Sequence, residues 1–445
     1  MIKAIQLTNL SCNLIKSDLL KNRLAMAKLS SEKLTKTLYQ LYYEGLLGLK
    51  NVNDDKNIEK LAELGFLKIS EVSESQFDIL SEKAKKEYEH FPLGHIEALN
   101  FELTYECNSN CPHCLLKTVR KKFHGKEISF ENAKRIIADA YFAGLLQNGI
   151  NFTGGEALLA KTDIFELIRY ASSYGIPTRL FTNSFWGNKF FFKAANQRFS
   201  SPLSLIKKLK SSGLNQLALS FDSRFDKDKA GVKQLTTIIQ ACETIGLNYE
   251  LISSPEIKEH LNSFLHYVKI SLEVNILKYM TPITMDLVDM GGAVSFEHHY
   301  NNNFSLKELI TNSQCKGKGF FQPNMITISP NGGVRSCMYG LGLENLGNIN
   351  DTNLLQIINN FNDNLSICFA EKKAFELADI IYEPYKDIYK PFSHNCSACV
   401  LLARLIHEYY MIKATKEPTK EQLLKMNYKV GKDLNLLKEN HLIKD

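Results

Sequence analysis

The sequence lacks any long apolar segment, and this absence excludes one class of protein at the outset. No window of the 445 residues approaches the about 18 consecutive apolar residues of a membrane span. The first residues, MIKAIQLTNL, lack the long apolar run and the small-residue cleavage site of a secretory signal peptide. We therefore expect a cytoplasmic globular protein, in which disulfides are rare and clustered cysteines more often hold metal.

A strong excess of charge of one sign is also missing. The chain has 54 basic and 48 acidic residues, with a net charge of +6. So small a bias in so long a chain indicates neither a nucleic acid nor a membrane as a partner. The length exceeds what one ordinary core accommodates, so we expect two to three domains.

The first 95 residues contain no clustered cysteines and have helical periodicity. Apolar residues recur at three- and four-residue spacing in 34–49, which predicts an amphipathic helix. Residues 58–70 predict a short helix that ends at Gly65, followed by a strand. This order fits a winged-helix module, and it fits a mainly helical cap equally well.

From about residue 97, short β-rich runs alternate with helical stretches, most of which end in glycine. This alternation predicts βαβ units with a parallel sheet, and its spacing suits a barrel or part of one. The chemistry of such folds lies at the carboxyl ends of the strands. The six predicted strands are 99–105, 149–154, 177–183, 215–221, 247–253 and 275–283.

Three of the ten cysteines follow the first of these strands: Cys107, Cys111 and Cys114. Thiolates are soft ligands that suit zinc, copper(I) or an iron–sulfur cluster. Structural zinc requires a fourth protein ligand, which His113 or His124 would have to supply. A [4Fe–4S] cluster held by three cysteines instead leaves one iron without a protein ligand. The three cysteines alone leave both interpretations open.

Further motifs follow at the ends of the next three predicted strands. They are Gly154-Gly155-Glu156, Thr182-Asn183-Ser184 and Ser220-Phe221-Asp222. Together with the Cys-x3-Cys-x2-Cys spacing, this order resembles the radical S-adenosylmethionine (SAM) superfamily. The resemblance implies a partial (β/α)6 TIM barrel.

The resemblance also implies the cofactors. The three cysteines would hold a [4Fe–4S] cluster whose open iron binds SAM, and an electron donor such as flavodoxin or ferredoxin would reduce it. SAM is then cleaved to a 5′-deoxyadenosyl radical that abstracts a hydrogen atom. His113 stands where the superfamily usually has an aromatic residue. The SAM-contacting positions would be His113, Gly154, Gly155, Glu156, Asn183, Ser220 and Asp222.

A second set of cysteines lies further along: Cys315, Cys337, Cys396 and Cys399. Asn-Gly within ISPNGGV predicts a hairpin just before Cys337. The order of Gly-x4-Cys, LGNI and Cys-x2-Cys resembles the SPASM/twitch extensions of radical SAM enzymes. Four ligands would hold one auxiliary [4Fe–4S] cluster, while a closed zinc site with the same ligands remains an alternative.

The remaining cysteines and the basic segments have plainer interpretations. Cys12 and Cys242 are predicted to be buried and structural, and Cys368 could replace one of the four auxiliary ligands. Lysine and arginine residues between 117 and 126 predict a solvated face. Alternatively, they border the mouth of the active site and attract an acidic substrate. A lysine-rich tail predicts a solvated helix.

The resulting division is an N-terminal module (1–95), a radical SAM core (96–300), a twitch-like domain (301–411) and a helical tail (412–445). Twitch and SPASM members mostly act on peptides or on amino-sugar-like small molecules. The resemblance therefore implies an oxidoreductase-type enzyme that matures a ribosomally synthesised precursor peptide (RiPP) by a C–C or C–O crosslink. The N-terminal module would then bind the leader of that peptide by strand addition. Asp286 or Asp289 is a candidate acid/base group, or a turn residue.

Three alternatives stay open. One is a radical SAM dehydrogenase for a small amino-sugar-like molecule. Another is a peptide epimerase or a sulfatase-type maturase. The third is a zinc-binding regulatory protein without catalysis.

Overall fold

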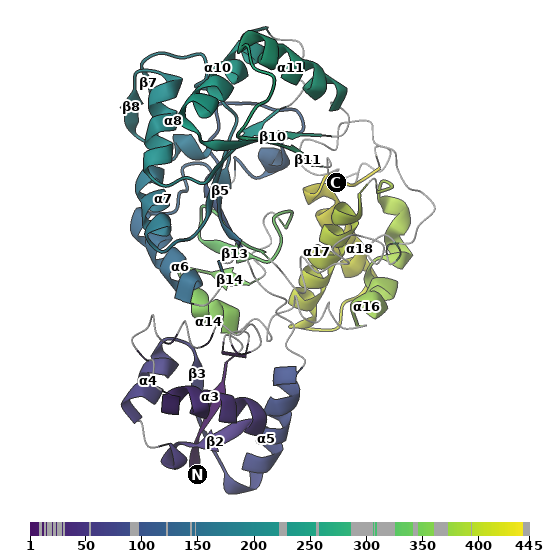
Figure 1. The fold of residues 1–445 in the computed structure, drawn as a ribbon. Helices are drawn as coiled ribbons and strands as arrows, with labels where there is room; N and C mark the ends of the chain where they lie inside the picture. Colours follow the sequence, from purple (N-terminus) through teal and green to yellow (C-terminus); the bar gives the residue numbers. More distant parts are fainter. Residues whose placement is uncertain are drawn as a thin grey trace.

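A computed structural model gives the fold of the protein (Figure 1). It describes residues 1–8, 32–52, 55–89, 98–121, 123–142, 145–146, 148–221, 229–254, 258–285, 325–340, 346–359, 373–392 and 394–438, and single positions 11, 12, 15, 20, 24, 29, 306 and 308. An N-terminal module, a sheet-based core and a group of C-terminal helices follow one another along the chain (Figure 1).

The N-terminal module combines a small sheet with helices. Its strands pair antiparallel in the order β2-β1-β3. The helices of this module still contain more residues than its strands, and the strand expected after Gly65 is present, whereas β1 and β2 were not predicted. The helix expected over 34–49 ends at Glu44, because Gly45 has φ +85° and leads into β2. The elements are β1 (Ile2–Leu7), α3 (Glu32–Glu44), β2 (Leu46–Gly48), α4 (Asp55–Glu63), β3 (Leu67–Val72) and α5 (Glu74–Glu89).

The core contains the six parallel strands that the sequence predicts. They are β4 (Ala98–Thr104), β5 (Gly149–Gly154), β6 (Thr178–Thr182), β9 (Gln216–Ser220), β10 (Asn248–Ser253) and β11 (Met280–Thr284). They belong to a nine-stranded sheet of order β11-β10-β9-β6-β5-β4-β12-β13-β14. Within the described residues the sheet does not close on itself, so the barrel is open.

Helices cover the outer face of this sheet, as Figure 1 shows. Their apolar residues pack in one core with Leu99, Phe152 and Leu180 of the strands. A two-stranded hairpin that the sequence analysis missed, β7 (Phe192–Ala194) and β8 (Gln197–Phe199), follows β6. The helices are α6 (Phe130–Phe142), α7 (Ile164–Ser173), α8 (Pro202–Ser211), α10 (Lys229–Ile245) and α11 (Lys258–Ser271).

The C-terminal part begins inside the core sheet. Strand β12 (Met325–Ile328) pairs parallel with β4 and forms the expected hairpin with β13 (Gly333–Arg335). The turn uses Gly332 at φ +85°, a conformation that favours glycine. The sheet therefore crosses the boundary expected near residue 300. Strand β14 (Gly347–Asn348) and helix α14 (Leu354–Asn359) follow.

Helices α16 (Lys373–Ile381), α17 (Asn395–Lys413) and α18 (Lys420–Asp433) form a second apolar cluster. The expectation of a solvated C-terminal helix is corrected for α18, which buries Leu423, Met426 and Val430. Asn427 of α18 is fully buried and donates to the Ile381 carbonyl oxygen over 2.8 Å. The lysines occupy only the outer side of this helix.

Candidate functional site

The three-cysteine loop begins at the carboxyl end of β4, next to the end of β5. The Gly155 amide donates to the Thr104 carbonyl oxygen over 2.7 Å, and the Glu156 amide donates to that of Glu106 over 2.9 Å. A Cβ atom at Gly155 would lie 2.4 Å from the Glu106 carbonyl oxygen, and one at Gly154 would lie 2.2 Å from that of Thr104. The two glycines are therefore required for the close approach of the chain's own backbone segments.

Arg120 fixes the cysteine loop from within. Its guanidinium donates to the carbonyl oxygen of Cys107 over 2.7 Å and to that of Ser109 over 2.9 Å. Hydrogen bonds from a charged donor are stronger than neutral ones. Of the basic residues that predicted a solvated face, Arg120 therefore belongs to the site.

Asn183 joins the end of β6 to the same loop. Its side-chain amide donates to Asn108 Oδ1 over 2.9 Å, to Ser109 Oγ over 3.0 Å and, more weakly, to Cys107 Sγ over 3.5 Å. The Ser109 amide also donates to Cys107 Sγ over 3.4 Å. Two N–H groups directed at one sulfur favour its thiolate form, although burial raises the pKa of the Cys107 thiol.

The Glu156 carboxylate is buried and bonded to protein donors. It accepts from the Asn183 amide over 2.7 Å, and from Thr182 Oγ1 and the Leu158 amide over 3.2 Å each. Burial raises the pKa of Glu156 to about 7, against the effect of these hydrogen bonds. The carboxylate thus joins the ends of β5 and β6.

A buried ion pair connects β4 with the C-terminal hairpin. Arg335 Nη2 donates to Glu102 Oε1 over 2.5 Å, and Tyr105 donates its hydroxyl to Glu102 Oε2 over 2.7 Å. Arg335 Nη1 donates to Ser329 Oγ over 2.5 Å. Sequence reasoning missed this network. The available signal was Glu102, a charged residue within a strand whose seven residues are all buried.

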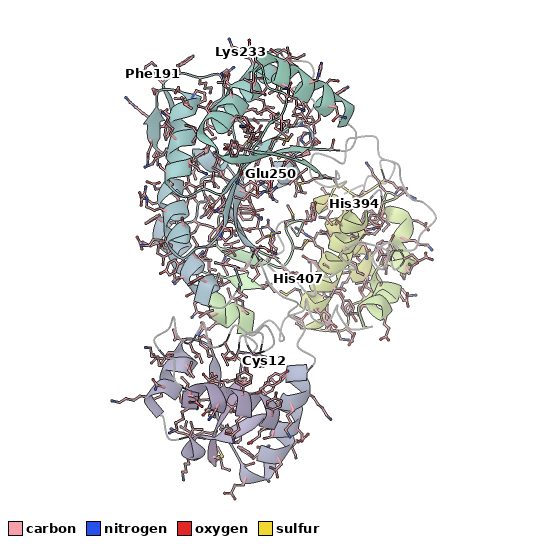
Figure 2. The ribbon with its side chains drawn as sticks, in the orientation of Figure 1. Cys12, Phe191, Lys233, Glu250, His394 and His407 are labelled. Carbon is pink, nitrogen blue, oxygen red and sulfur yellow. The ribbon has the colours of Figure 1, made fainter. Side chains whose placement is uncertain are left out.

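Three of the four predicted auxiliary ligands border the C-terminal apolar cluster. Cys396 and Cys399 lie one turn apart at the start of α17, and Cys337 packs against the same cluster. His394, which the sequence analysis did not single out, caps α17 by accepting from the Cys396 amide over 3.1 Å (Figure 2). Leu115, next to Cys114, contacts this cluster too.

Several predicted residues lie outside the part of the chain that the structure describes: Asp222, Asp286, Asp289, Cys315 and Cys368. Ser220 is the last residue of β9, at the same edge as the cysteine loop. His113 lies in that loop and is half-buried. Cys12 and Cys242 are fully buried, as predicted.

The described residues contain no group of three His, Cys, Asp or Glu side chains already placed around a common metal position. The donor chemistry nevertheless fits an iron–sulfur cluster. Three thiols share one loop, and N–H groups approach the sulfur of Cys107. Backbone geometry keeps the loop compact, since the Cys114 amide donates to the Cys111 carbonyl oxygen over 3.2 Å.

Comparison with known proteins gives the class of this domain. Residues 101–245 match the radical SAM superfamily. The chain therefore contains the domain of this superfamily of enzymes, as the cysteine spacing and the strand-end motifs predict.

Similar proteins have several activities. The chain is 34% identical to PqqA peptide cyclase of Rhodopseudomonas palustris over 20% of this chain and 22% of that protein. It is 32% identical to mycofactocin maturase MftC of Mycolicibacterium smegmatis over 19% of this chain and 20% of that protein. It is 31% identical to 7,8-dihydro-6-hydroxymethylpterin dimethyltransferase of Methanocaldococcus jannaschii, over 34% of this chain and 28% of that protein.

Each match thus spans less than a third of the relative's own length. Across the described residues, no helix combines the length and apolarity that crossing a bilayer requires.

Proposed function

We propose that this protein is a radical SAM maturase of a ribosomally synthesised precursor peptide. The observation that carries the proposal is the three-cysteine loop at the carboxyl end of β4, inside the segment that matches the superfamily. Parallel α/β folds hold their chemistry at this end of the strands. Cys107, Cys111 and Cys114 would hold a [4Fe–4S] cluster, which when bound supplies the electron that cleaves SAM to a 5′-deoxyadenosyl radical.

The residues around this loop would orient the cofactors. Arg120 holds the loop carbonyls, and Asn183 donates to the loop and toward the Cys107 sulfur. Glu156 keeps the ends of β5 and β6 together, so that Gly154 and Gly155 present backbone groups to SAM. At the next strand end, Ser220 would contact SAM. Asp222, two positions later in the sequence, would complete the proposed SAM contacts.

A peptide substrate has two supports. Two similar proteins are named as a peptide cyclase and as a maturase. The N-terminal sheet also ends in β3, which pairs on one side with β1 and, among the described residues, has no strand on its other side. Such an edge can accept an extended peptide as an additional strand. We propose that the leader of the precursor binds there.

The C-terminal cysteines support an auxiliary [4Fe–4S] cluster of twitch type. Cys337, Cys396 and Cys399 border one apolar cluster, and Cys315 or Cys368 would supply the fourth thiolate. Zinc accepts the same four ligands. We favour the iron–sulfur cluster because it could accept the electron left after crosslink formation. An electron donor such as flavodoxin or ferredoxin and a reducing, cytoplasmic location belong to the same proposal.

Anoxic purification and turnover test the proposal. The holoenzyme should be brown, hold about eight irons per chain and produce 5′-deoxyadenosine faster when a short peptide encoded beside its gene is added. A colourless zinc protein would contradict the cofactor assignment. Turnover that never depends on a peptide would instead favour a small-molecule enzyme, a candidate that the pterin dimethyltransferase match keeps open.

A further inference from the structure

A cavity of about 350 Å³ lies at the opposite end of the core sheet from the cysteine loop. It opens among the first residues of the parallel strands, including Ile150 of β5, Thr178 of β6 and Gln216 of β9. Its volume is at the lower end of the about 300–1,000 Å³ typical of small-molecule sites. The cavity therefore has room for a short segment or a small molecule.

One row of polar side chains crosses the sheet beside this cavity. Asn100 pairs in register with Asn151, Asn151 with Arg179, and Arg179 with Gln216. Neighbouring residues of paired strands project to the same face of a sheet. The alternate residues, such as Leu180, pack into the core under the helices. The row therefore belongs to the inner face of the open barrel.

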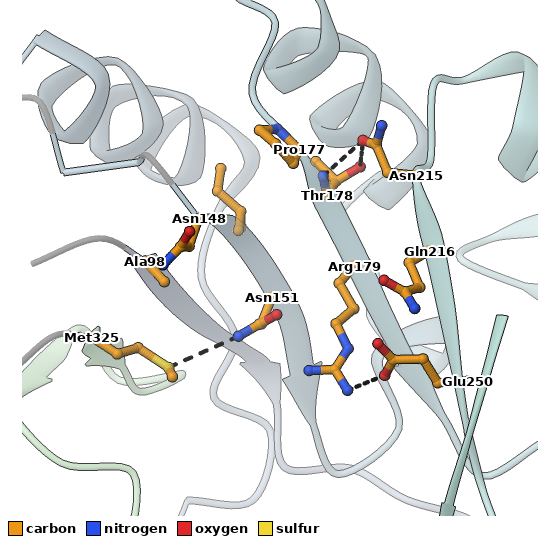
Figure 3. Close-up of a pocket in the computed structure, with 11 residues that line it drawn as sticks. Ala98, Asn148, Asn151, Pro177, Thr178, Arg179, Asn215, Gln216, Glu250 and Met325 are labelled. Atoms are coloured by element: carbon orange, nitrogen blue, oxygen red, sulfur yellow. Dashed lines mark hydrogen bonds and ion pairs between the residues drawn. The ribbon is translucent and has the colours of Figure 1, made fainter. Parts of the chain in front are cut away.

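The cavity contains one cation and one anion, and they neutralise each other. Arg179 and Glu250 form an ion pair, and their side chains point toward one another in Figure 3. The Arg179 guanidinium also lies over the Phe181 ring, 4.4 Å from its centroid. These two contacts fix the guanidinium at the side of the cavity.

Unused hydrogen-bonding groups of both kinds surround this pair. Arg179 Nε is buried and has no hydrogen-bond partner among the described residues. The Gln216 amide also forms no hydrogen bond there, and Asn151 uses only its Nδ2, in a weak contact of 3.9 Å with Met325 Sδ. The wall thus offers both donors and acceptors but no net charge.

We infer that this cavity is a second binding site, which takes an uncharged amide-bearing segment of the substrate peptide. Arg179 and Glu250 are already paired with each other, so neither is left to bind a charged group of the ligand. A peptide amide supplies one acceptor and one donor and repels neither charge. The identity of this ligand rests on the proposed function, because only a peptide substrate brings such a segment to the enzyme.

The cavity and the cysteine loop lie at different levels of the core sheet. Arg179 and Asn183 are four residues apart along β6 and its end, which corresponds to about 13 Å at about 3.3 Å per residue. Hydrogen transfer needs contact between the reacting groups. We therefore place in this site a part of the peptide other than the side chain that reacts beside the cysteine loop.

Calorimetric titration of the anoxic holoenzyme with acetyl-triglycine amide, an uncharged peptide, tests the inference. Gln216→Leu should weaken binding at least tenfold, as should the paired change Arg179→Gln/Glu250→Gln, which preserves neutrality. Gln40→Leu, at an exposed position of α3, is the matched control and should bind like the wild type. Melting temperatures of all variants, measured alongside, separate lost binding from lost folding.

Hydrogen–deuterium exchange with the same peptide should slow at 148–151 and 215–217. Three results would overturn the site: no binding at millimolar peptide, equal binding by Gln216→Leu and wild type, or a preference for glucose or for uncapped triglycine. Binding without any peptide-dependent 5′-deoxyadenosine formation would support the site and refute the maturase. Peptide-dependent turnover without binding here would refute the site alone.

Discussion

Replacing Arg335 with methionine should destabilise the core more than the loss of any surface charge. The change leaves the Glu102 carboxylate buried without its cation, since both side chains are at most 7% exposed. Removing one partner of a buried ion pair costs about 3–5 kcal/mol. The Tyr105 hydroxyl still donates to Glu102 but carries no positive charge. We therefore expect the free energy of unfolding to fall by about 3–5 kcal/mol.

Urea denaturation of the apo protein measures this loss. Trp186 is the only tryptophan and is fully buried next to β6, so its fluorescence reports the unfolding of the core sheet. Arg169→Met is the matched control. It removes an arginine whose partner Glu166 is 44% exposed, and it should cost about 0–1 kcal/mol.

The double variant Arg335→Met/Glu102→Leu separates the ion pair from simple packing. It should lose clearly less stability than the sum of the two single changes, because it leaves no buried charge alone. Additive losses would refute the coupling. A loss below about 1 kcal/mol for Arg335→Met, no larger than that of the control, would show that the pair contributes nothing of this size.

Three further outcomes are expected. Arg120→Met should lower the amount of iron bound after anoxic reconstitution, because the Cys107 and Ser109 carbonyl oxygens lose their hydrogen bonds to the guanidinium. Lys121→Met is the control and should bind as much iron as the wild type. Equal iron in both variants would contradict this role of Arg120. Gly155→Ala should abolish iron binding or folding, since its Cβ would lie 2.4 Å from a carbonyl oxygen, and an intact variant would show that the loop can shift. The raised pKa of Glu156, about 7, should make unfolding free energy fall by about 3 kcal/mol as pH rises from about 5 to about 8, because the unfolded carboxyl loses its proton first. Glu156→Gln should flatten this dependence in pH-resolved urea titrations, and an unchanged slope would assign the effect elsewhere.

Much of the core could be predicted because its signals are local. Each parallel strand is a short β-rich run, and glycines such as Gly175 and Gly246 end the preceding helices at positive φ. The cysteine loop and the strand-end motifs then meet at one edge because parallel strands all end there. The spacing of Leu423, Met426 and Val430 also indicated an apolar face on α18. The many lysines of this segment favoured a solvated helix instead, so the buried face was not predicted.

Contacts between distant segments could not be predicted. Arg335 and Glu102 are 233 positions apart, and no spacing rule connects them. The N-terminal sheet was missed for a related reason, since β1 pairs with β3 across about sixty residues and β2 has only three residues. Arg120 looked like its lysine neighbours in the sequence. Only the folded loop turns its guanidinium toward the Cys107 carbonyl.

Low-temperature electron paramagnetic resonance of the dithionite-reduced protein, before and after SAM is added, shows whether the cluster has an iron that binds SAM. The measurement uses a Cys337→Ala/Cys396→Ala/Cys399→Ala variant, in which a C-terminal cluster cannot form. Its signal then cannot overlap with that of the cluster at the three-cysteine loop. We expect a [4Fe–4S] signal that changes shape on addition of SAM, because SAM binds the one iron of the cluster that has no cysteine ligand. A silent, colourless protein with one bound zinc, or an iron–sulfur signal indifferent to SAM, would contradict it.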